Sequence, residues 1–373
     1  MRSFAFLRRP IFRLTASWLP TAVLIGCLST IALTARAQPD PSAWLRSHHY
    51  AFDPAAGFEG PLADTLAREL STFHLILQAE GGSHYLTLYD TLQLAWLKFL
   101  NQRRGLTCFI GESGTSEAVL FNHYLQNPDS SLKKLRKRFF FENLYKFNST
   151  LSASHQLYFA GIDFERPVTY MPALKALLPP TPPPATIIAA IGLIKQSPDS
   201  GYDCDATIAF NKKLKSSLDA AEPAYRDYLG KSYPDFEKIV RNNGSCKDAL
   251  RNRNPHMADN FLALDKTTNA DVYFGEFGEA HTILKNRVLA SLIARNERFH
   301  DKVAVINLYC QDCSNTREGN SNWPFREIEA DIQRYFLPLC DSDYTLFDLS
   351  GDAPEIARYK AYGQWLIVSK FGH

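Results

Sequence analysis

The chain alternates between short apolar runs and longer stretches in which apolar residues recur every three or four positions. The run Phe73–Leu77 is typical of a buried strand, and the apolar positions from Leu88 to Leu100 form a helical stripe. A second apolar run, Leu106–Ile110, repeats the pattern and is followed by a helical segment, Ser116–Gln126. Strands that alternate with helices favour a parallel sheet with helices on both faces. The sequence therefore predicts an α/β fold with a mostly parallel sheet.

The alternation stops at a proline-rich segment, Leu178–Pro184, which is stiff enough to mark a boundary. Residues 185–265 show helical patterns and polar loops, so we expect a helical insertion or subdomain there. The α/β domain is then built from two parts, residues 38–178 and 266–373. The further expected elements are helices Leu62–Ser71, Leu132–Phe147 and Thr282–Arg298, and strands Leu157–Ala160, Asp271–Phe274, Val303–Tyr309, Tyr344–Asp348 and Gln364–Ser369.

The first 37 residues have the layout of a bacterial export signal. Several arginines precede the apolar stretch Ala22–Leu33, and Ala35–Ala37 is a small-residue cleavage site. We expect cleavage before Gln38 and an exported protein, periplasmic or secreted. The segment Leu24–Cys27 also resembles a lipobox, so a lipid anchor at Cys27 is an alternative. No later segment approaches the ~20 apolar residues that a membrane-spanning helix needs.

Charge and cysteine content add further expectations. A formal net charge of +2 over 373 residues gives no reason to expect a nucleic acid as partner, and we expect a small-molecule substrate. Export would place the remaining cysteines in an oxidising environment. We expect a disulfide between Cys204 and Cys246, a bond from Cys310 to Cys313 or to Cys340, and a core position for Cys108.

Three clusters of acidic residues and histidines follow predicted strands. The first cluster contains Glu80 and His84, the second Glu112, and the third Glu279 and His281. The carboxyl ends of parallel strands meet at one edge of a sheet, where open α/β sheets bind their ligands. A histidine can take a proton from water while a carboxylate orients its ring. The clusters therefore predict one hydrolytic or metal-binding site, the alternative being that Glu80 and His84 only cap backbone amides.

Other residues near these strand ends are weaker candidates. Asp163 follows a fourth strand and is expected to brace the pocket, and Glu276 adds acidity to the third cluster. The segment Gly111–Thr115 nearly matches the G-x-S-x-G nucleophile elbow, but Thr115 replaces its last glycine. We therefore favour Ser113 or Thr115 as a helix N-cap over Ser113 as a nucleophile.

The order and context of these motifs resemble the erythromycin esterase family. The resemblance runs from about residue 70 to about residue 290 and implies a parallel-sheet α/β hydrolase with a helical insertion. It also implies catalysis by histidine and glutamate rather than by a serine nucleophile. The matching segments, in chain order, are Ala79–His84, Glu112, Asn122–Tyr124, Leu144–Asn148, Gly161–Asp163, Arg253–Asn260 and His281.

The resemblance also implies roles for individual residues. His84 is the general base that activates water, and Glu80 and Glu112 position it. His281 polarises the substrate carbonyl or protonates the leaving group. Arg253 is a structural or binding brace.

The chain departs from the family pattern at three positions. Thr87 stands where the family has an arginine, Gly278 where its later turn has a first histidine, and Asn254 where an aspartate follows Arg253. The loss of a cation and an imidazole argues against cleavage of a macrolide lactone. The extra carboxylates Glu276 and Glu279 shift the site toward metal binding instead.

Three functions remain open from the sequence. The first is an exported hydrolase that cleaves an ester or related bond through water activated by His84. The second is a divalent-metal hydrolase with Glu80, His84, Glu112 and His281 as ligands, a donor set that suits zinc, manganese or iron. The third is a catalytically reduced protein that binds a small molecule or glycan. No other cofactor is predicted.

Overall fold

The computed structural model describes residues 40–80, 87–128, 138–199, 203–242, 249–284, 286–312, 314–315, 319–320 and 325–371. Residues 40–373 form one unit. The expected export signal, Cys27, His84, Cys246 and Cys313 lie outside the described residues.

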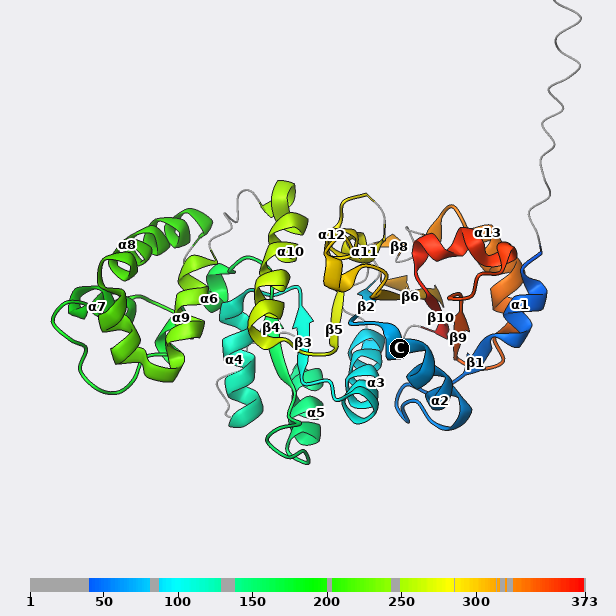
Figure 1. Ribbon diagram of the computed structural model, residues 1–373, viewed down its shortest axis with the longest axis horizontal. Coiled ribbons are helices and arrows are strands. Elements are labelled where there is room, and N and C mark those ends of the chain that lie inside the picture. The colour runs from blue at the N-terminus through cyan, green and yellow to red at the C-terminus, as the bar shows by residue number, and fades with distance from the viewer. Residues whose placement is uncertain are drawn as a thin grey trace, which may run out of the picture. The chain divides into compact units, whose positions relative to one another are not determined.

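A single large sheet runs through this unit in the strand order β1-β9-β10-β6-β2-β5-β3-β4 (Figure 1). Neighbouring strands from β10 to β4 are all parallel, whereas β9 runs antiparallel to both β10 and β1. The predicted α/β fold with a mostly parallel sheet is therefore confirmed, and the sheet has an antiparallel portion at one edge. The strands are β1 (His49–Ala51), β2 (Leu75–Glu80), β3 (Cys108–Gly111), β4 (Tyr158–Gly161), β5 (Tyr273–Gly278), β6 (Val303–Asp312), β9 (Tyr344–Asp348) and β10 (Trp365–Phe371), and β7 (Ser314–Asn315) pairs separately with β8 (Gly319–Asn320).

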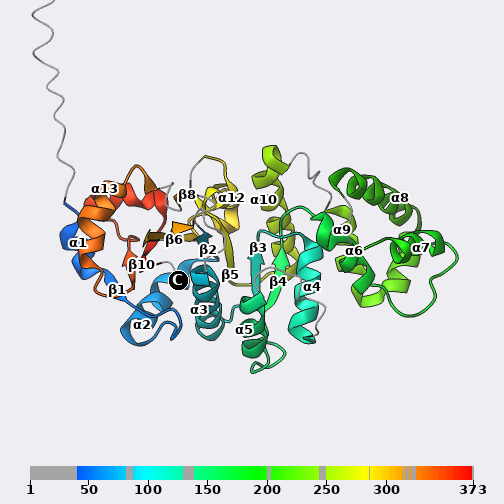
Figure 2. The same cartoon turned by 180° about the vertical axis from the view of Figure 1, so that it is seen from behind.

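Helices cover both faces of the sheet (Figures 1 and 2). Successive strand residues point to opposite faces, so Ile76 packs in one apolar cluster while Leu75 and Leu77 pack in another. The first cluster includes side chains from α2 (Gly60–Glu69), α3 (Thr87–Arg104), α4 (Thr115–Gln126) and α5 (Arg138–Asn148). The second includes side chains from α10 (Ala249–Thr268) and α12 (Leu289–Ile293).

The described elements between β4 and β5 are all helical. They are α6 (Pro167–Ala176), α7 (Ile188–Gln196), α8 (Cys204–Leu229), α9 (Tyr233–Arg241) and α10. Helices α6 to α9 share a separate apolar cluster, which includes Tyr170, Leu218 and Phe236 and also Val119 of α4. Helix α10 packs on the sheet instead, through Met257 and Phe261. The division of this region into a subdomain stays a prediction.

Two asparagines cover the outer edge of β4. The Asn122 side chain donates to the Phe159 carbonyl and accepts from the Phe159 amide, each at 2.8 Å. Asn148 makes the same pair of bonds with Leu157, at 2.7 and 2.8 Å. A side-chain amide thus takes the place of a neighbouring strand and keeps this edge from pairing with another chain.

Two strands extend further than their apolar runs predict. Strand β2 continues through Glu80, and β5 continues to Gly278, so Glu276 lies inside a strand rather than after it. The expected helix Thr282–Arg298 is wrong. The described residues of this segment form only the end of α11 (Glu279–Thr282), α12 and a 3-10 turn, because Asn286 and Arg287 adopt positive φ angles of 68° and 56° that a helix cannot contain.

The described cysteines settle part of the expected disulfide pattern. Cys108 and Cys340 are free and buried, so Cys108 is a core residue as predicted and a bridge from Cys310 to Cys340 is wrong. Cys204 and Cys310 are not free thiols. Their expected partners, Cys246 and Cys313, lie outside the described residues, and these pairings stay predictions.

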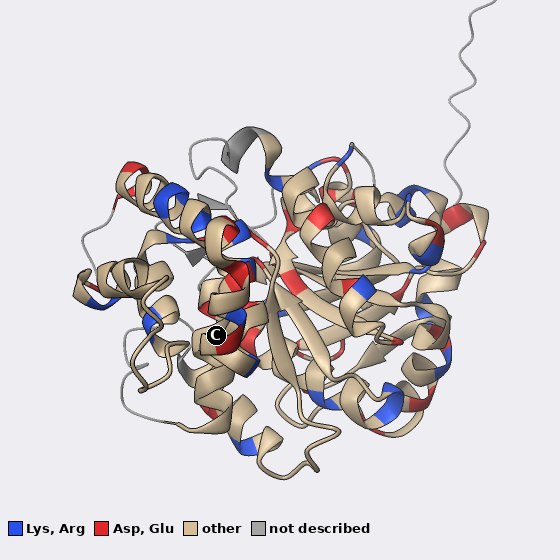
Figure 3. Ribbon diagram, turned by 60° about the vertical axis from the view of Figure 1, so that its left-hand side comes forward, with Lys and Arg blue, Asp and Glu red and all other residues tan. Residues whose placement is uncertain are grey.

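The remaining described α-helices are short: α1 (Ser42–Ser47) and α13 (Glu329–Asp331). A 3-10 helix also spans Pro354–Tyr362. Basic and acidic residues are interspersed over the ribbon (Figure 3), in line with the small net charge. Among the described residues, we find no helix with the length and apolar character required to cross a membrane.

Candidate functional site

The predicted clusters meet where four neighbouring parallel strands end. Strands β2, β5, β3 and β4 are adjacent, and their register places Glu80 beside Gly278 and Gly111 beside Gly161. Glu112 and Asp163 therefore follow two strands that end side by side. This is the edge at which open α/β sheets bind ligands.

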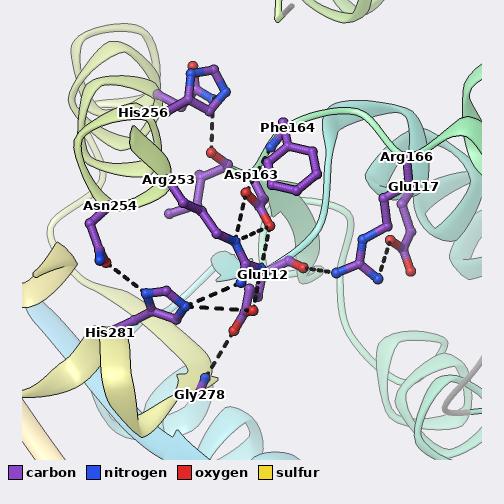
Figure 4. Close-up of polar contacts among 12 residues, drawn as sticks. Glu112, Glu117, Asp163, Phe164, Arg166, Arg253, Asn254, His256, Gly278 and His281 are labelled. Atoms are coloured by element: carbon purple, nitrogen blue, oxygen red, sulfur yellow. Dashed lines mark hydrogen bonds and ion pairs between the residues drawn. The ribbon is translucent and has the colours of Figure 1, made fainter. Parts of the chain in front are cut away.

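Glu112 lies at the centre of a polar network at this edge (Figure 4). One carboxylate oxygen, Oε1, accepts from Arg253 Nη2, and the other, Oε2, accepts from the Gly278 amide at 3.0 Å. His281 Nε2 is 3.8 Å from Oε1. Burial alone raises the pKa of Glu112, but Arg253, His281 and the Gly278 amide together lower it below its usual value. Glu112 is therefore a carboxylate at neutral pH.

Arg253 connects Glu112 to a second carboxylate, Asp163. Its Nη2 lies 2.6 Å from Asp163 Oδ2, and its Nε lies 3.1 Å from the same oxygen. Asp163 is fully buried, and its Oδ1 also accepts from the Phe164 amide at 2.9 Å. Burial lowers the pKa of Arg253, but Asp163 and Glu112 raise it above its usual value. The guanidinium therefore stays charged and contacts both carboxylates.

His281 completes the described part of the network. It lies on α11, and its side chain is 12% exposed. Its Nδ1 lies 2.7 Å from Asn254 Oδ1, and its Nε2 lies 3.4 Å from Arg253 Nη1. Arg253 and Asn254 are consecutive residues of α10, so one helix contacts both nitrogens of the ring. The edge thus combines an imidazole, a charged guanidinium and a carboxylate, which are functional groups used in acid–base and electrostatic catalysis.

A buried glutamate, rather than a serine or threonine side chain, caps helix α4. Glu165 accepts from the Thr115 and Ser116 amides, each at 2.9 Å. The N-cap residue is Gly114, where a Cβ would lie only 2.7 Å from Glu165 Oε2. The expectation that Ser113 or Thr115 caps this helix is therefore wrong. Burial raises the pKa of Glu165 to about 7, although the two amides and Asn242 act in the opposite direction.

The other acidic candidates lie in buried positions around the network. Glu276 accepts from Gln78 Nε2 at 2.8 Å inside the sheet, and both residues are buried. In the sheet it lies opposite Gly111, the residue that precedes Glu112. Glu80, the last residue of β2, and Glu279, the first residue of α11, are also buried.

His84 lies outside the described residues, so its expected place in the site stays a prediction. In the described part of the chain, no group of three or more His, Cys, Asp or Glu side chains could hold a metal ion. Glu112 and His281, two of the four ligands considered from the sequence, both contact Arg253. A guanidinium in that position repels a cation, so these two residues do not fit a shared metal.

Two residues of the network escaped sequence reasoning. The sequence marks Asn254 only as a departure from the family pattern, because nothing in the sequence shows that it contacts His281. Glu165 follows Asp163 by two residues, and no local pattern indicates that it caps a helix some 50 positions earlier. Both roles depend on contacts between segments that are far apart in the chain.

Comparisons with known proteins find similarity in structure but not in sequence. No family model matches the chain, and no curated protein matches it. A protein from Bacillus cereus is 11% identical, with a TM-score of 0.62 over 88% of this chain and 96% of its own. A succinoglycan biosynthesis protein, also 11% identical, has a TM-score of 0.62 over 90% of this chain and 97% of its own.

A mutant of erythromycin esterase EreC, in its open conformation, is similar over 82% of this chain and 92% of its own. Its TM-score is 0.53, and it is 11% identical. At this level of identity the likeness concerns the fold alone. The chain therefore has a distant structural relationship to erythromycin esterase.

Proposed function

We propose that this protein is a hydrolase that cleaves an ester or related bond in a small molecule with a water molecule activated by histidine and glutamate. The observation that carries the proposal is the contact of His281 Nε2 with Arg253 and Glu112 at the carboxyl edge of the sheet. The structural likeness to erythromycin esterase supports a hydrolase-like fold. Because the chain departs from the family pattern at Thr87 and Gly278, we propose a substrate that is not a macrolide.

The proposal gives a role to each group at this edge. Water attacks the carbonyl carbon, and its proton passes to a neutral imidazole, His281 Nε2 or His84. The negative charge that develops on the carbonyl oxygen is stabilised by the Arg253 guanidinium. The C–O bond then breaks, and the leaving oxygen takes the proton back from the imidazolium. The products are a carboxylic acid and an alcohol.

The carboxylates act by holding and balancing charge. Glu112 and Asp163 fix the Arg253 guanidinium from two sides. Glu112 also stabilises an imidazolium at His281, since its Oε1 is 3.8 Å from Nε2. Glu80 is proposed to position His84. The arginine-rich and apolar segments at the start of the chain further support export of the enzyme.

The test is a hydrolysis assay on the purified protein. Nitrophenyl esters of graded acyl length and a macrolide lactone serve as substrates, with His281→Ala and Glu112→Gln as variants. We expect turnover of at least one non-macrolide ester and losses in kcat of about 10²-fold or more in both variants, the usual contribution of acid–base catalysis.

The matched control is His300→Ala, because His300 is 71% exposed and pairs only with Asp301 among the described contacts. It should retain full activity. The proposal is wrong if no ester is hydrolysed, or if His281→Ala and Glu112→Gln both fold normally and keep their turnover.

A further inference from the structure

The His281 ring has contacts at both nitrogens that determine which one carries the proton. A neutral imidazole has one N–H donor and one acceptor nitrogen, and the choice must be inferred from its neighbours. Nδ1 faces Asn254 at 2.7 Å, and Nε2 faces Arg253 at 3.4 Å, with Glu112 Oε1 3.8 Å away.

The first neighbour is the Asn254 side-chain oxygen. Asn254 Oδ1 lies 2.7 Å from His281 Nδ1 and also accepts from the Leu289 amide at 3.0 Å. Leu289 is the first residue of α12, so its amide has no partner within that helix and must donate elsewhere. A backbone N–H can only donate, which identifies the facing Asn254 atom as the oxygen. Nδ1 must then donate to it.

The second neighbour is the Arg253 guanidinium. Arg253 Nη1 lies 3.4 Å from His281 Nε2. An arginine side chain has donors and no acceptor, so Nε2 must be the acceptor. The two ends of the ring therefore agree: the proton sits on Nδ1 and the lone pair on Nε2.

We infer that Asn254 is a positioning residue that holds His281 as the Nδ1–H tautomer and directs its Nε2 lone pair toward Arg253 and Glu112. The inference rests on the proposed function, because the lone pair at Nε2 is what can take a proton from water. Asn254 does not contact the reacting atoms. It acts through His281, and α10 supplies it next to Arg253 so that both contacts move together.

Asparagine at this position orients the ring without adding a charge. An aspartate would accept from Nδ1–H in the same way, but it would also bring a third carboxylate close to Glu112 and Asp163. In the described network, Arg253 is the guanidinium that contacts both of those carboxylates. The neutral amide keeps the tautomer and leaves the charge balance at Arg253 as it is.

The direct test is NMR on protein labelled with ¹⁵N in its histidines, of which the chain has 10. Long-range ¹H–¹⁵N correlations report which ring nitrogen carries the proton, and the missing signal in His281→Asn assigns the resonance. The variants are Asn254→Ala, which removes the acceptor, and Asn254→Asp, which keeps it. Asn252→Ala is the matched control, because Asn252 is an exposed asparagine on the same helix.

We expect the Nδ1–H tautomer in the wild type, in Asn254→Asp and in Asn252→Ala. Asn254→Ala should populate the Nε2–H tautomer and lose about 10²-fold in kcat, with little change in KM. The inference is overturned if the wild type carries its proton on Nε2, or if Asn254→Ala keeps the Nδ1–H tautomer and full turnover. The wild-type spectrum decides the first point even if Asn254→Ala does not fold.

The two proposals fail in different ways. An Nδ1–H tautomer in a protein that hydrolyses no ester contradicts the proposed function and leaves the positioning of His281 intact. Ester hydrolysis by a protein with the Nε2–H tautomer contradicts the positioning of His281 and leaves the function intact.

Discussion

The contact between Asp163 and Arg253 should make a large contribution to stability, and Asp163→Asn measures it. Asp163 is fully buried and accepts from Arg253 Nε and Nη2 and from the Phe164 amide. In the variant, the Phe164 amide keeps its acceptor oxygen, so the new NH₂ group takes the place of Oδ2. It then faces the Arg253 donors, which leaves a donor–donor conflict and a partly unpaired guanidinium.

Breaking a buried ion pair costs about 3–5 kcal/mol. We place Asp163→Asn near the lower end, about 3 kcal/mol, because Arg253 keeps its contact with Glu112. For a chain of this size that corresponds to a fall in Tm of roughly 4 °C. Urea unfolding followed by circular dichroism and thermal unfolding both measure the change.

A double-mutant cycle with Arg253→Met separates the contact from other effects of each change. Arg253→Met alone leaves Asp163 as an uncompensated buried carboxylate, whereas the double variant removes both charges. The losses in free energy of unfolding of the two single variants should therefore not add up to the loss in the double variant. The difference, which is the coupling energy, should be about 2–3 kcal/mol. Asp199→Asn is the control, because Asp199 pairs with Lys175 while 68% exposed, and it should unfold like the wild type. Additive losses within about 0.5 kcal/mol would refute the reasoning.

Two further predictions concern the elements beneath the site. Burial raises the pKa of Glu165 from 4.5 to about 7, so its contribution to stability is lost as pH rises between those values, by up to roughly 3 kcal/mol. Urea unfolding from pH 4 to pH 8 should show a flatter dependence in Glu165→Gln, and parallel curves would contradict this. Gly161→Ala should destabilise by several kcal/mol, since a Cβ there would lie 2.2 Å from the Gly114 carbonyl oxygen. Gly192→Ala is the control, because a Cβ added at this position of helix α7 has no atom within 4 Å. It should raise the free energy of unfolding by up to about 1 kcal/mol. Equal Tm values for the two variants would contradict the close-packing argument.

The local pattern predicts the kinds of element well because apolar runs and helical stripes are properties of neighbouring residues. Strands β3 and β9 and helix α4 lie within one or two residues of their predicted bounds, and α3 contains the whole predicted stripe. The order of the strands in the sheet, in contrast, cannot be read from neighbouring residues. Strand β5 inserts between β2 and β3, and β9 runs against its neighbours, because pairing depends on residues that are far apart in the chain.

Strand ends were the less predictable feature, and they decide where the acidic residues lie. An apolar run ends where polar residues begin, but a strand ends where its backbone pairing ends. Gln78 and Glu80 pair with Glu276 and Gly278 in the same ladder, although the apolar runs have already ended. Glu276 thus became a partner of Gln78 inside the sheet, a position that its place after Phe274 in the sequence does not reveal.

The site itself was predictable to the extent that it depends on strand ends. Glu112 follows β3 and Asp163 follows β4, and the alternation of elements was enough to bring both to one edge. Arg253 and Asn254 reach the same edge from a helix about 90 residues after Asp163. Only the resemblance to a family indicated Arg253, and no pattern indicated Asn254.

The motifs that resemble the family pattern contain two kinds of residue: those that stabilise the fold and those proposed to take part in the reaction. Asn122 and Asn148 pair with the edge of β4, and Asn260 donates to the Ile162 carbonyl at 2.8 Å, so all three hold the segment that positions Asp163. Their agreement with a family pattern is therefore evidence about architecture. It says little about the reaction.

The evidence about chemistry comes from the residues around Glu112. Gly278 replaces a histidine of the family pattern, yet its backbone amide still donates to Glu112 Oε2. The change therefore removes an imidazole without releasing the carboxylate. Among the described residues that contact Glu112, His281 is the one imidazole, so the proton transfers fall to it and to His84. Whether His281 can accept a proton at Nε2 depends in turn on Asn254, a neutral side chain that orients the ring.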